Sequence, residues 1–280
     1  MKIEYAGKHV FITGGSSGIG LALARLLAAQ GASIITILAR RQNLLVQAAE
    51  EIRSACIHSE QKVQALQGDV GEMETIIPLL EHYQEVNGVP DILINSAGIT
   101  YPGKFSVLPP EIFRDLVNIN YLGTVYVSRA FVNGMIRRGN GWIVNISSMA
   151  GFIGTYGYSG YGASKYAVRG FSDVLRAELK PRGVRVSVVY PPDTLTPQLE
   201  FEKDLKPAIT RELAETAGVM TAEKVASIIL RDMQRGRYTI LPGLQSWFYY
   251  SLSSLLGDLT YVVMDMEIKN AIRRIVKRRQ

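Results

Sequence analysis

Short runs of β-branched and other apolar residues alternate along this chain with longer stretches in which apolar positions recur at helical spacing. The runs with strand character occupy residues 9–13, 33–38, 62–66, 91–95, 142–146, 184–190 and 238–241. Apolar strands separated by amphipathic helices are typical of a parallel sheet that is covered on both faces. The pattern therefore predicts an α/β fold built on a doubly wound parallel sheet of about seven strands.

The chain is long enough for one large domain. Its 280 residues are 47% hydrophobic, which supplies the side chains of a single well-buried core. Thr221 has a hydroxyl that is well placed to cap a helix before the last expected strand. We expect a catalytic domain over residues 1–243 and an extension over residues 244–280 that is first apolar and then basic.

The positive charge lies at the end of the chain. The net charge is +6, and outside residues 269–280 the 25 basic residues balance the 25 acidic ones. The last segment has no acidic residue and six basic ones, Lys269, Arg273, Arg274, Lys277, Arg278 and Arg279. The expected catalytic body is therefore neutral, and the extension carries the whole excess.

The cysteine content and the first residues of the chain indicate in which cellular compartment the protein is found. Cys56 is the single cysteine, so neither a disulfide within the chain nor a thiolate cluster for a metal is expected. The first ten residues lack the long apolar stretch of a signal peptide. We expect the protein in the cytoplasm or on the cytoplasmic side of a membrane, and we expect no metal site.

A glycine-rich turn follows the first expected strand. Residues 13–20 read T-G-G-S-S-G-I-G and lead directly into an apolar helix pattern. Such glycines permit a tight turn and a close approach of phosphate, and the helix N-terminus attracts the anion. The order of strand, turn and helix predicts a dinucleotide site of the Rossmann type, although a glycine turn alone is weak evidence. The expected contacts in this turn are Gly14, Ser16, Ser17, Gly18, Ile19 and Gly20.

The end of the second expected strand indicates which dinucleotide binds. A site for NAD usually has an acidic residue there to hold the ribose hydroxyls, whereas this chain has Arg40 followed by Arg41. A guanidinium suits a 2′-phosphate, and Ser16 can donate to the same group. We therefore expect NADPH or NADP+ as the cofactor. The alternative is that Arg40 and Arg41 only begin a solvated helix.

Two further segments are expected at the cofactor. Asp69 and Val70 follow the third strand, where the carboxylate can accept from the adenine amino group or can cap the following helix. The fourth strand ends in N-S-A-G, whose small residues let the backbone pass close to the ribose. The expected contacts in this second segment are Asn95, Ala97 and Gly98. A purely structural role is the alternative for Asn95.

The candidate catalytic residues are Ser148, Tyr161 and Lys165. Tyr161 and Lys165 are four residues apart and hence on one helix face, where the ammonium can lower the pKa of the phenol. Ser148 closes the fifth strand thirteen residues before Tyr161, so its hydroxyl can meet the phenol and polarise a substrate oxygen. This constellation predicts acid–base chemistry at a carbonyl or alcohol carbon.

Taken in order, these motifs resemble the short-chain dehydrogenase/reductase family over roughly residues 7–242. The resemblance rests on T-G-x-x-x-G-x-G, N-x-A-G, a serine, Y-x-x-x-K and a proline-led loop. It implies hydride transfer between a nicotinamide and the substrate carbon, with Tyr161 as the acid or base and Lys165 also holding the nicotinamide ribose.

The resemblance also assigns roles to residues outside the three catalytic candidates. Asn120 matches a fourth catalytic position, which bends its helix and holds a water next to Lys165, and a polar residue satisfied inside a helix is the alternative. Thr194 and Thr196 can reach the nicotinamide carboxamide, and Pro191 is a further expected contact of the cofactor. The segment 198–220 would form a lid over the substrate. Pro192 departs from the family, which usually has glycine there, and stiffens the loop.

Within the family, three segments resemble the 3-ketodihydrosphingosine reductase group. They are Y-P-P-D-T-L-T-P at 190–197, I-N-Y-L-G-T-V-Y-V-S-R-A at 119–130 and Y-A-V-R-G-F at 166–171. This resemblance implies that NADPH reduces the keto group of a long-chain lipid, the 3-keto group of 3-ketodihydrosphingosine. A reductase of another hydrophobic carbonyl, such as a retinoid, a steroid or a 3-oxoacyl compound, stays open. An NADP(H)-binding sensor or scaffold is the alternative that is not an enzyme.

The extension predicts contact with a membrane. Residues 244–264 are apolar and aromatic but interrupted by serines and Asp258, so they suit the interface better than a span. Beyond them, apolar residues share one helical face and basic residues crowd the others, which favours binding to anionic lipid. The alternative is that both segments pack on the body or on a second subunit of a homo-oligomer. Nucleic acid is not an expected partner, because no reading element accompanies the basic residues.

Overall fold

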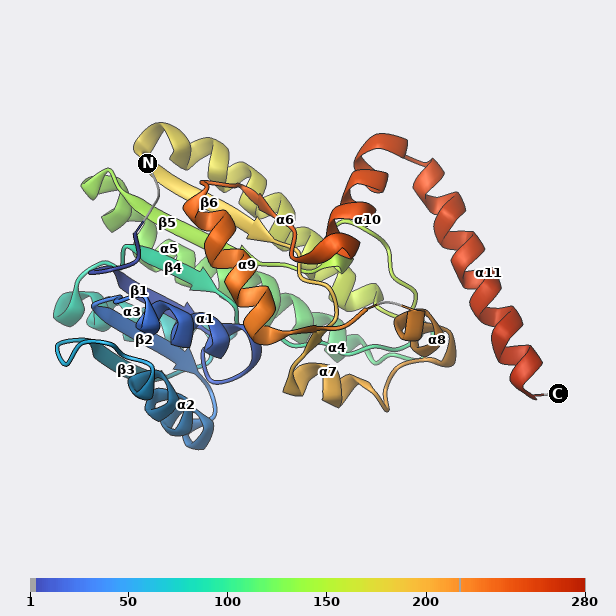
Figure 1. Cartoon of the computed structure of the whole chain (residues 1–280), viewed down its shortest axis with the longest axis horizontal. Coiled ribbons are helices and arrows are strands. Elements are labelled where there is room, and N and C mark those ends of the chain that lie inside the picture. Colours follow the sequence, from blue (N-terminus) through green and yellow to red (C-terminus); the bar gives the residue numbers. More distant parts are fainter. Residues whose placement is uncertain (1–3, 217, 280) are drawn as a thin grey trace.

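The computed structural model describes residues 4–216 and 218–279, and a seven-stranded parallel sheet lies at its centre (Figure 1). The strand order is β3-β2-β1-β4-β5-β6-β9. The strands are β1 (His9–Thr13), β2 (Ile34–Ala39), β3 (Lys62–Gln67), β4 (Ile92–Asn95), β5 (Gly141–Ile146), β6 (Val184–Val189) and β9 (Thr239–Ile240). The predicted α/β class and parallel sheet are confirmed, and each strand begins and ends within two residues of its apolar run.

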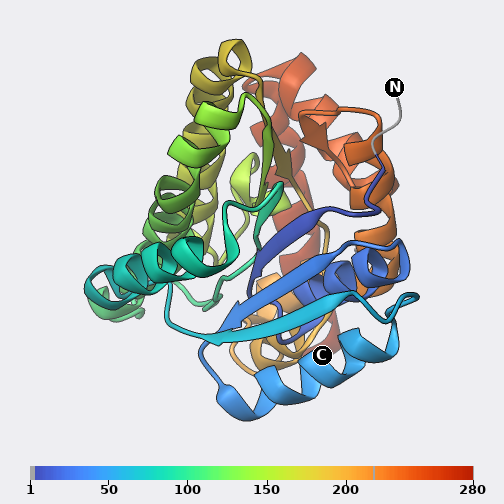
Figure 2. The same ribbon diagram turned by 90° about the vertical axis from the view of Figure 1, so that its left-hand side faces the viewer.

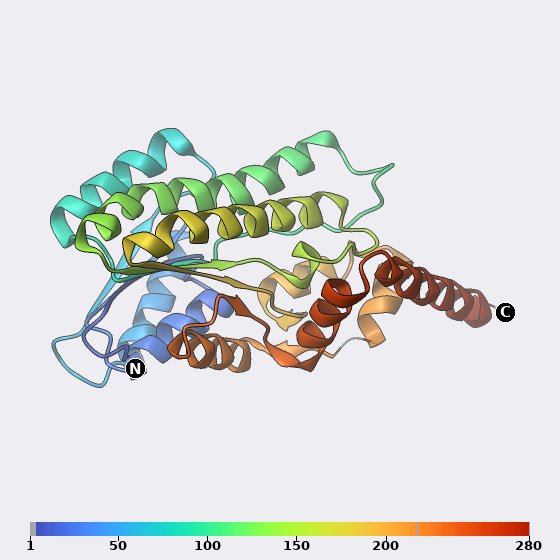
Figure 3. The ribbon, with the colours of Figure 1, turned by 90° about the horizontal axis from the view of Figure 1, so that it is seen from above.

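Helices cover both faces of the sheet, as the apolar character of the strands requires. One face packs against α1 (Gly18–Ala29), α2 (Gln42–Ser54) and α9 (Ala222–Gln234), and the other against α3 (Met73–Asn87), α5 (Gly123–Arg138) and α6 (Ser159–Leu179). Val10 and Ile12 of β1 join the first core, and Phe11 between them joins the second, because successive side chains of a strand point to opposite faces. Figure 3 shows the three layers, and Figure 2 shows α2 and α3 on opposite sides of the sheet.

The strand order reverses between β1 and β4. The chain runs outward from β1 to β3 and then returns to place β4 on the other side of β1. At such a switch point the loops after the two central strands turn in opposite directions and leave a crevice at their carboxyl ends. Thr13 at the end of β1 joins the two loops, since its Oγ1 accepts from the backbone N–H groups of Ser96 and Ala97, each at 3.1 Å.

Smaller elements complete the carboxyl edge of the sheet. Helix α4 (Pro110–Leu116) runs through a π-helical segment, Val117–Leu122, into α5, and a 3₁₀ turn, Met149–Gly151, follows β5. A second 3₁₀ turn, Lys180–Arg182, precedes β6. Helices α7 (Pro197–Glu202) and α8 (Ala208–Thr216) lie in the segment expected as a lid, and the short strands β7 (Thr194–Leu195) and β8 (Met220–Thr221) pair across its ends. The expected N-cap of α9 is confirmed, because Thr221 Oγ1 accepts from the N–H of Lys224 at 3.2 Å.

The extension forms α10 (Gly243–Leu256) and α11 (Leu259–Arg279). Tyr250 of α10 packs on Phe152 and Tyr190. Helix α11 runs back along α8 (Figure 1), where Arg274 Nε and Arg278 Nη1 lie 2.7 and 2.9 Å from the carboxylate of Glu212. Both helices therefore pack on the body of this chain, and two basic residues expected to face lipid are ion-paired instead. None of the described helices combines the length and apolar character needed to cross a bilayer.

Candidate active site

A cavity of about 380 Å³ opens at the carboxyl edge of the sheet, where the strand order reverses. Its walls come from the glycine turn, the ends of β2 to β6, α6, the segment of α7 and α8, and the extension. Most of the predicted site residues line it together: Gly14, Ser16, Ser17, Gly18, Ile19, Gly20, Arg40, Arg41, Asp69, Val70, Ala97, Gly98, Ser148, Tyr161, Lys165, Pro191, Thr194 and Thr196. Asn95 and Asn120 lie behind the walls.

The glycine turn leaves no room for side chains. A Cβ on Gly14 would lie 2.8 Å from backbone atoms of Ser96 and Ala97, and a Cβ on Gly20 would lie 2.4 Å from the carbonyl oxygen of Gly14. Gly14 and Gly18 also have positive φ values, which L-residues with side chains rarely adopt. Helix α1 begins at Gly18 against the cavity, so its first N–H groups face the space that this cradle encloses. The residues present therefore fit the pyrophosphate of a dinucleotide.

Arg40 and Asp69 form an ion pair at the cofactor end of the cavity. Arg40 Nη1 lies 3.3 Å from Asp69 Oδ2, while Asp69 Oδ1 accepts from the N–H of Gly71 at 2.9 Å. Asp69 does not cap the following helix, since the N-cap residue of α3 is Glu72. Arg41 is the N-cap residue of α2, and the Arg40 side chain is half exposed at the cavity.

Asn95 is part of a buried network behind β4. Its Nδ2 donates to Ser128 Oγ and to Asn145 Oδ1, both at 2.9 Å. Among the side chains that the structure describes, none donates to its buried Oδ1. The placement favours the structural alternative for Asn95 over direct contact with a ribose.

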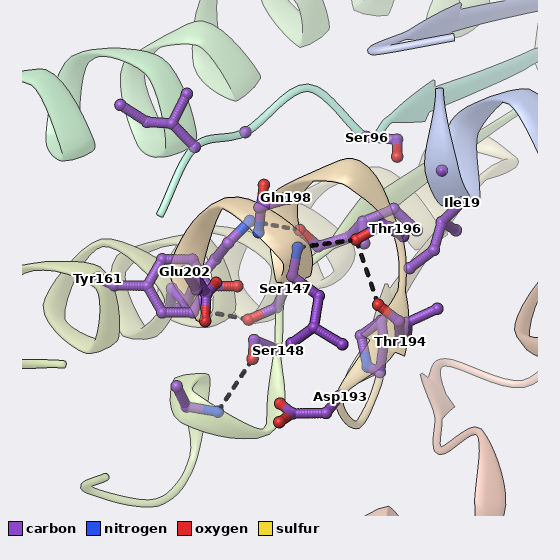
Figure 4. Close-up of a pocket in the computed structure, with 18 of the residues that line it drawn as sticks. Ile19, Ser96, Ser147, Ser148, Tyr161, Asp193, Thr194, Thr196, Gln198 and Glu202 are labelled. Carbon is purple, nitrogen blue, oxygen red and sulfur yellow. Dashed lines mark hydrogen bonds between the residues drawn. The ribbon is translucent and has the colours of Figure 1, made fainter. Parts of the chain in front are cut away.

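Ser148, Tyr161 and Lys165 line the cavity together, and Figure 4 shows the first two of them. Lys165 lies one turn after Tyr161 on α6, with its Nζ 5.7 Å from the centroid of the phenol ring. The same Nζ donates to the carbonyl oxygen of Ile146 at 3.0 Å, at the end of β5. Ser148 accepts from the N–H of Ala150 at 3.2 Å, and this hydrogen bond fixes the hydroxyl at the start of the 3₁₀ turn.

Burial controls the protonation of the two titratable groups. Burial raises the pKa of Tyr161, and the nearby carboxylates of Glu202 and Asp193 raise it further, while a hydrogen bond with Ser148 lowers it. Burial lowers the pKa of Lys165 to about 8. The expectation that the pKa of the Tyr161 phenol lies below its ordinary value is therefore wrong, because removal of the phenol from water outweighs the neighbouring groups that lower that pKa. Tyr161 holds its proton at neutral pH, which is the form a proton donor needs.

Asn120 lies in the π-helical segment and is fully buried. Its Oδ1 accepts from the N–H of Ile99 at 2.8 Å, and its Nδ2 donates to Ser164 Oγ at 2.9 Å. A Cβ on Gly98 would lie 3.0 Å from Asn120 Oδ1 and 3.3 Å from Lys165 Nζ, so these two polar groups flank the same glycine. The side chain is thus satisfied by protein groups, and it fixes the loop after β4 against α6.

Sequence reasoning missed several polar residues of the cavity, and four of these form a connected cluster. They are Tyr158, Asp193, Glu202 and Lys206. Tyr158 donates to Glu202 Oε2, and Lys206 Nζ lies 3.4 Å from the same oxygen and 3.6 Å from Asp193 Oδ2. The only signal in the sequence is the four-residue spacing of Glu202 and Lys206, which is also typical of a solvated helix face. Figure 4 shows Glu202 beside Tyr161 and Asp193 on the side of Ser148.

The extension also contributes to the cavity. Gln245 and Tyr249 of α10, and Met264 and Glu267 of α11, line its outer end. The hydroxyl of Tyr249 donates to Glu267 Oε1 at 2.7 Å and so joins the two helices. The proposed boundary near residue 243 stays a prediction, but the two parts share one site.

Comparisons with known proteins agree with the fold and with the motifs. The model of the family described as short chain dehydrogenase matches residues 8–205. A 3-dehydrosphinganine reductase of Danio rerio is 37% identical, with 95% of this chain and 80% of that protein aligned, and a 3-ketodihydrosphingosine reductase of Bos taurus is 39% identical over 93% and 79%.

Solved structures agree as well. Levodione reductase superposes with a TM-score of 0.76 at 25% identity, covering 86% of this chain and 98% of that one. A metagenomic short-chain oxidoreductase in complex with NADP superposes with a TM-score of 0.67 at 25% identity, covering 83% and 92%. The resemblance inferred from the motifs is confirmed: this chain belongs to the short-chain dehydrogenase family and is an oxidoreductase that uses a nicotinamide cofactor.

Proposed function

We propose that this protein uses NADPH to reduce the 3-keto group of 3-ketodihydrosphingosine to the secondary alcohol of dihydrosphingosine, an early step in sphingolipid synthesis. The observation that carries the proposal is the similarity to reductases named for this substrate, which covers 95% of the chain in one case. Such a match must reach into the extension, and the extension lines the outer end of the cavity. The likeness therefore includes the region that would meet the substrate as well as the catalytic centre.

Ser148 and Tyr161 supply the acid chemistry in this proposal. Ser148 donates a hydrogen bond to the ketone oxygen, and Tyr161, protonated because of its raised pKa, transfers its proton to that oxygen. Bound NADPH supplies the hydride that the carbonyl carbon receives. Lys165, fixed by the carbonyl oxygen of Ile146, holds the nicotinamide ribose and stabilises the phenolate that remains. Asn120 is a positioning residue, which keeps the loop at Gly98 against Lys165.

The chain offers a separate group of residues for each part of the cofactor. The glycine turn and the first turn of α1 would hold the pyrophosphate, and Arg40 with Ser16 would bind the 2′-phosphate. Asp69 and Val70 would meet the adenine, and Ala97 and Gly98 would border the ribose. Pro191, Thr194 and Thr196 would meet the carboxamide. Asp69 supports the preference for NADPH indirectly, because its ion pair holds the Arg40 guanidinium at the cavity.

A membrane surface is the partner we propose for the extension. Apolar side chains stand exposed along both of its helices, among them Leu244, Trp247, Phe248, Leu255, Leu259, Tyr261 and Val262. Leu244 and Leu255 are 86% and 83% exposed, which is unfavourable in water and suits the boundary between lipid headgroups and chains. A lipid ketone could then pass from the bilayer into the outer end of the cavity. The exposed apolar side chains support a position at a membrane surface, and the single cysteine, Cys56, fits its cytoplasmic side.

Turnover of defined carbonyl compounds tests the proposed function. NADPH oxidation would be followed with 3-ketodihydrosphingosine and, in parallel, with retinal, a ketosteroid and an oxoacyl thioester. We expect the highest kcat/KM with 3-ketodihydrosphingosine and a loss of at least about 1000-fold in Tyr161→Phe, in line with removal of a general acid. A higher kcat/KM with one of the other carbonyl compounds would identify that compound as the substrate in place of 3-ketodihydrosphingosine. Tight NADPH binding with no turnover of any carbonyl compound would favour the alternative that the protein is an NADP(H)-binding sensor or scaffold.

A further inference from the structure

The charged residues of the cavity are distributed unevenly along it. Arg40, Arg41 and Asp69 lie at the cofactor end and sum to a positive charge. Beyond Lys165 the charged lining residues are Asp193, Glu202, Glu267 and Lys206, which is three carboxylates against one ammonium. The end where a substrate would lie is therefore negative when these carboxyl groups are ionised, and an apolar ketone alone has no use for that charge.

Glu202 is held rigidly beside the catalytic tyrosine. It is buried at the end of α7, where it accepts from the Tyr158 hydroxyl and pairs with Lys206. The ring of Tyr158 in turn lies 5.7 Å from the ring of Tyr161, between centroids. Burial raises the pKa of the Glu202 carboxyl, while the Tyr158 hydrogen bond and Lys206 lower it. The net effect is a raised pKa, so a further cation beside this buried carboxylate would stabilise its ionised form.

Asp193 faces the same space from the opposite wall. Its carbonyl oxygen accepts from the N–H of Met220 at 3.0 Å, which anchors the loop just before β7. Its carboxylate has one described ion-pair partner, Lys206 at 3.6 Å, and the side chain lines the cavity and is 38% exposed. Lys206 is shared between both carboxylates, so it neutralises only one of the two charges. These three side chains together leave one negative charge, near enough to Tyr161 for both carboxylates to raise the pKa of its phenol.

We propose that Asp193 and Glu202 form a cation subsite that binds the protonated 2-amino group of the substrate and selects α-amino ketones over plain ketones. The inference rests on the proposed function for the ketone itself. In such a substrate the amine is on the carbon next to the carbonyl carbon, so a ketone oxygen at Ser148 and Tyr161 brings the ammonium close to both carboxylates. Lys206 and Tyr158 act as positioning groups that hold Glu202 in place.

The alternative is that the cluster only latches α7 onto Tyr158. A latch would affect every substrate alike, because it would shape the whole wall of the cavity. A cation subsite would affect only substrates with an amine. The two roles are therefore separated by the ratio of kcat/KM for two ketones that differ only in that group.

The test compares 3-ketodihydrosphingosine with its deamino analogue, which has hydrogen in place of the amine. In Asp193→Asn and Glu202→Gln we expect KM for the amino ketone to rise roughly 10- to 100-fold, the usual effect of losing a hydrogen bond to a charged group. We expect KM for the deamino analogue to change by less than about 3-fold, so the variants should lose most of the preference for the substrate with the amine. Both substitutions keep the size of the side chain, and an amide oxygen can still accept from Tyr158.

Glu200→Gln is the matched control. Glu200 also lies on α7 and also pairs with a lysine, Lys203, but it is exposed and does not line the cavity. We expect it to leave both KM values unchanged. Equal losses for the two ketones in Asp193→Asn and Glu202→Gln, or no loss, would overturn the subsite.

Inhibition tests the same subsite without turnover. A long-chain 2-amino alcohol should inhibit the wild-type enzyme more strongly than the matching plain alcohol, and the difference should vanish in Asp193→Asn. The proposed function fails separately, when the wild-type enzyme does not reduce 3-ketodihydrosphingosine. If the enzyme reduces it but the variants keep the wild-type preference, only the subsite is overturned.

Discussion

The guanidinium of Arg40 lies 3.3 Å from the carboxylate of Asp69, across the gap between the ends of β2 and β3. The pair joins two loops that border the cofactor end of the cavity. An exposed ion pair of this kind adds little stability. It restricts the rotamers of Arg40, however, so the guanidinium would lose less side-chain entropy on binding the 2′-phosphate of the proposed cofactor.

Arg40→Ala should change the choice of cofactor. We expect KM for NADPH to rise roughly 10- to 100-fold, since a charge-assisted contact to a phosphate is lost, while KM for NADH changes little. Steady-state kinetics with both cofactors measures the ratio. Arg53→Ala, at the other end of α2 and outside the cavity, should leave both values unchanged. Equal effects of Arg40→Ala on NADPH and NADH would remove the argument for phosphate recognition.

Lys165 should set the alkaline limit of ketone reduction. Burial lowers its pKa from 10.5 to about 8, so the ammonium is present below that pH and is lost above it. The phenolate left on Tyr161 is stabilised by the charged form only. We therefore expect kcat/KM for reduction to fall as the pH rises through about 8, measured from pH 6 to 10.

The variant Lys165→Arg tests whether Lys165 causes this fall in kcat/KM at alkaline pH. A guanidinium stays charged throughout this range, so the variant should be slower but should lose the decline near pH 8. If kcat/KM declines near pH 8 in Lys165→Arg as it does in the wild type, a titratable group other than Lys165 causes the decline.

The sequence predicted correctly those features that depend on residues close together in the chain. Buried parallel strands need continuous apolar runs, so the seven strands could be located to within two residues. The turn at Gly14 and the spacing of Tyr161 and Lys165 also depend on short stretches of chain. The glycine turn and the catalytic residues lie at the same edge of the sheet because the carboxyl ends of parallel strands share that edge, which the fold class already implies.

What the sequence could not reveal depends on contacts between distant segments. Tyr158 and Glu202 are 44 positions apart, and no pattern in either segment indicates the hydrogen bond between them. Arg274 and Glu212 are even more distant in the sequence, so the basic face of α11 was expected to be free. The pKa of Tyr161 was misjudged for the same reason, since burial at this site is a property of the assembled walls.

Gly20→Ala should damage the cofactor cradle. The new methyl group would lie 2.4 Å from the carbonyl oxygen of Gly14, and a backbone atom cannot move aside cheaply. We expect a loss of about 1–3 kcal/mol in the free energy of unfolding, together with weaker NADPH binding. Denaturant unfolding and cofactor titration measure the two effects.

Gly170→Ala is the matched control within α6, because a Cβ there meets nothing within 4 Å. It should raise stability by about 0.4–1 kcal/mol, as replacement of a helical glycine does, and leave cofactor binding unchanged. A stable Gly20→Ala protein that binds NADPH normally would contradict the close packing of the turn.

The exposed apolar side chains of the extension should control binding to membranes. In the full chain, Trp247→Ser combined with Leu255→Ser removes two large side chains that are 59% and 83% exposed. We expect the wild-type protein to float with vesicles of phosphatidylcholine and phosphatidylserine, and the double variant to stay largely unbound, because burial of apolar area at the interface drives this association. Val86→Ser with Val174→Ser, at exposed positions of α3 and α6, should float as the wild type does.

The basic residues of α11 should add a dependence on anionic lipid. Arg274 and Arg278 both pair with Glu212, and Arg278 also lies 3.5 Å from Glu215, so the attraction would come from Lys269, Arg273 and Lys277, whose side chains are exposed. Lys269→Glu with Lys277→Glu should weaken flotation on vesicles that contain phosphatidylserine, and should have little effect on pure phosphatidylcholine. Equal flotation of the wild type and both extension variants would show that the exposed face has another role. A second copy of the chain would then be the candidate partner, and the molar mass in solution, with and without the Trp247 and Leu255 substitutions, would decide.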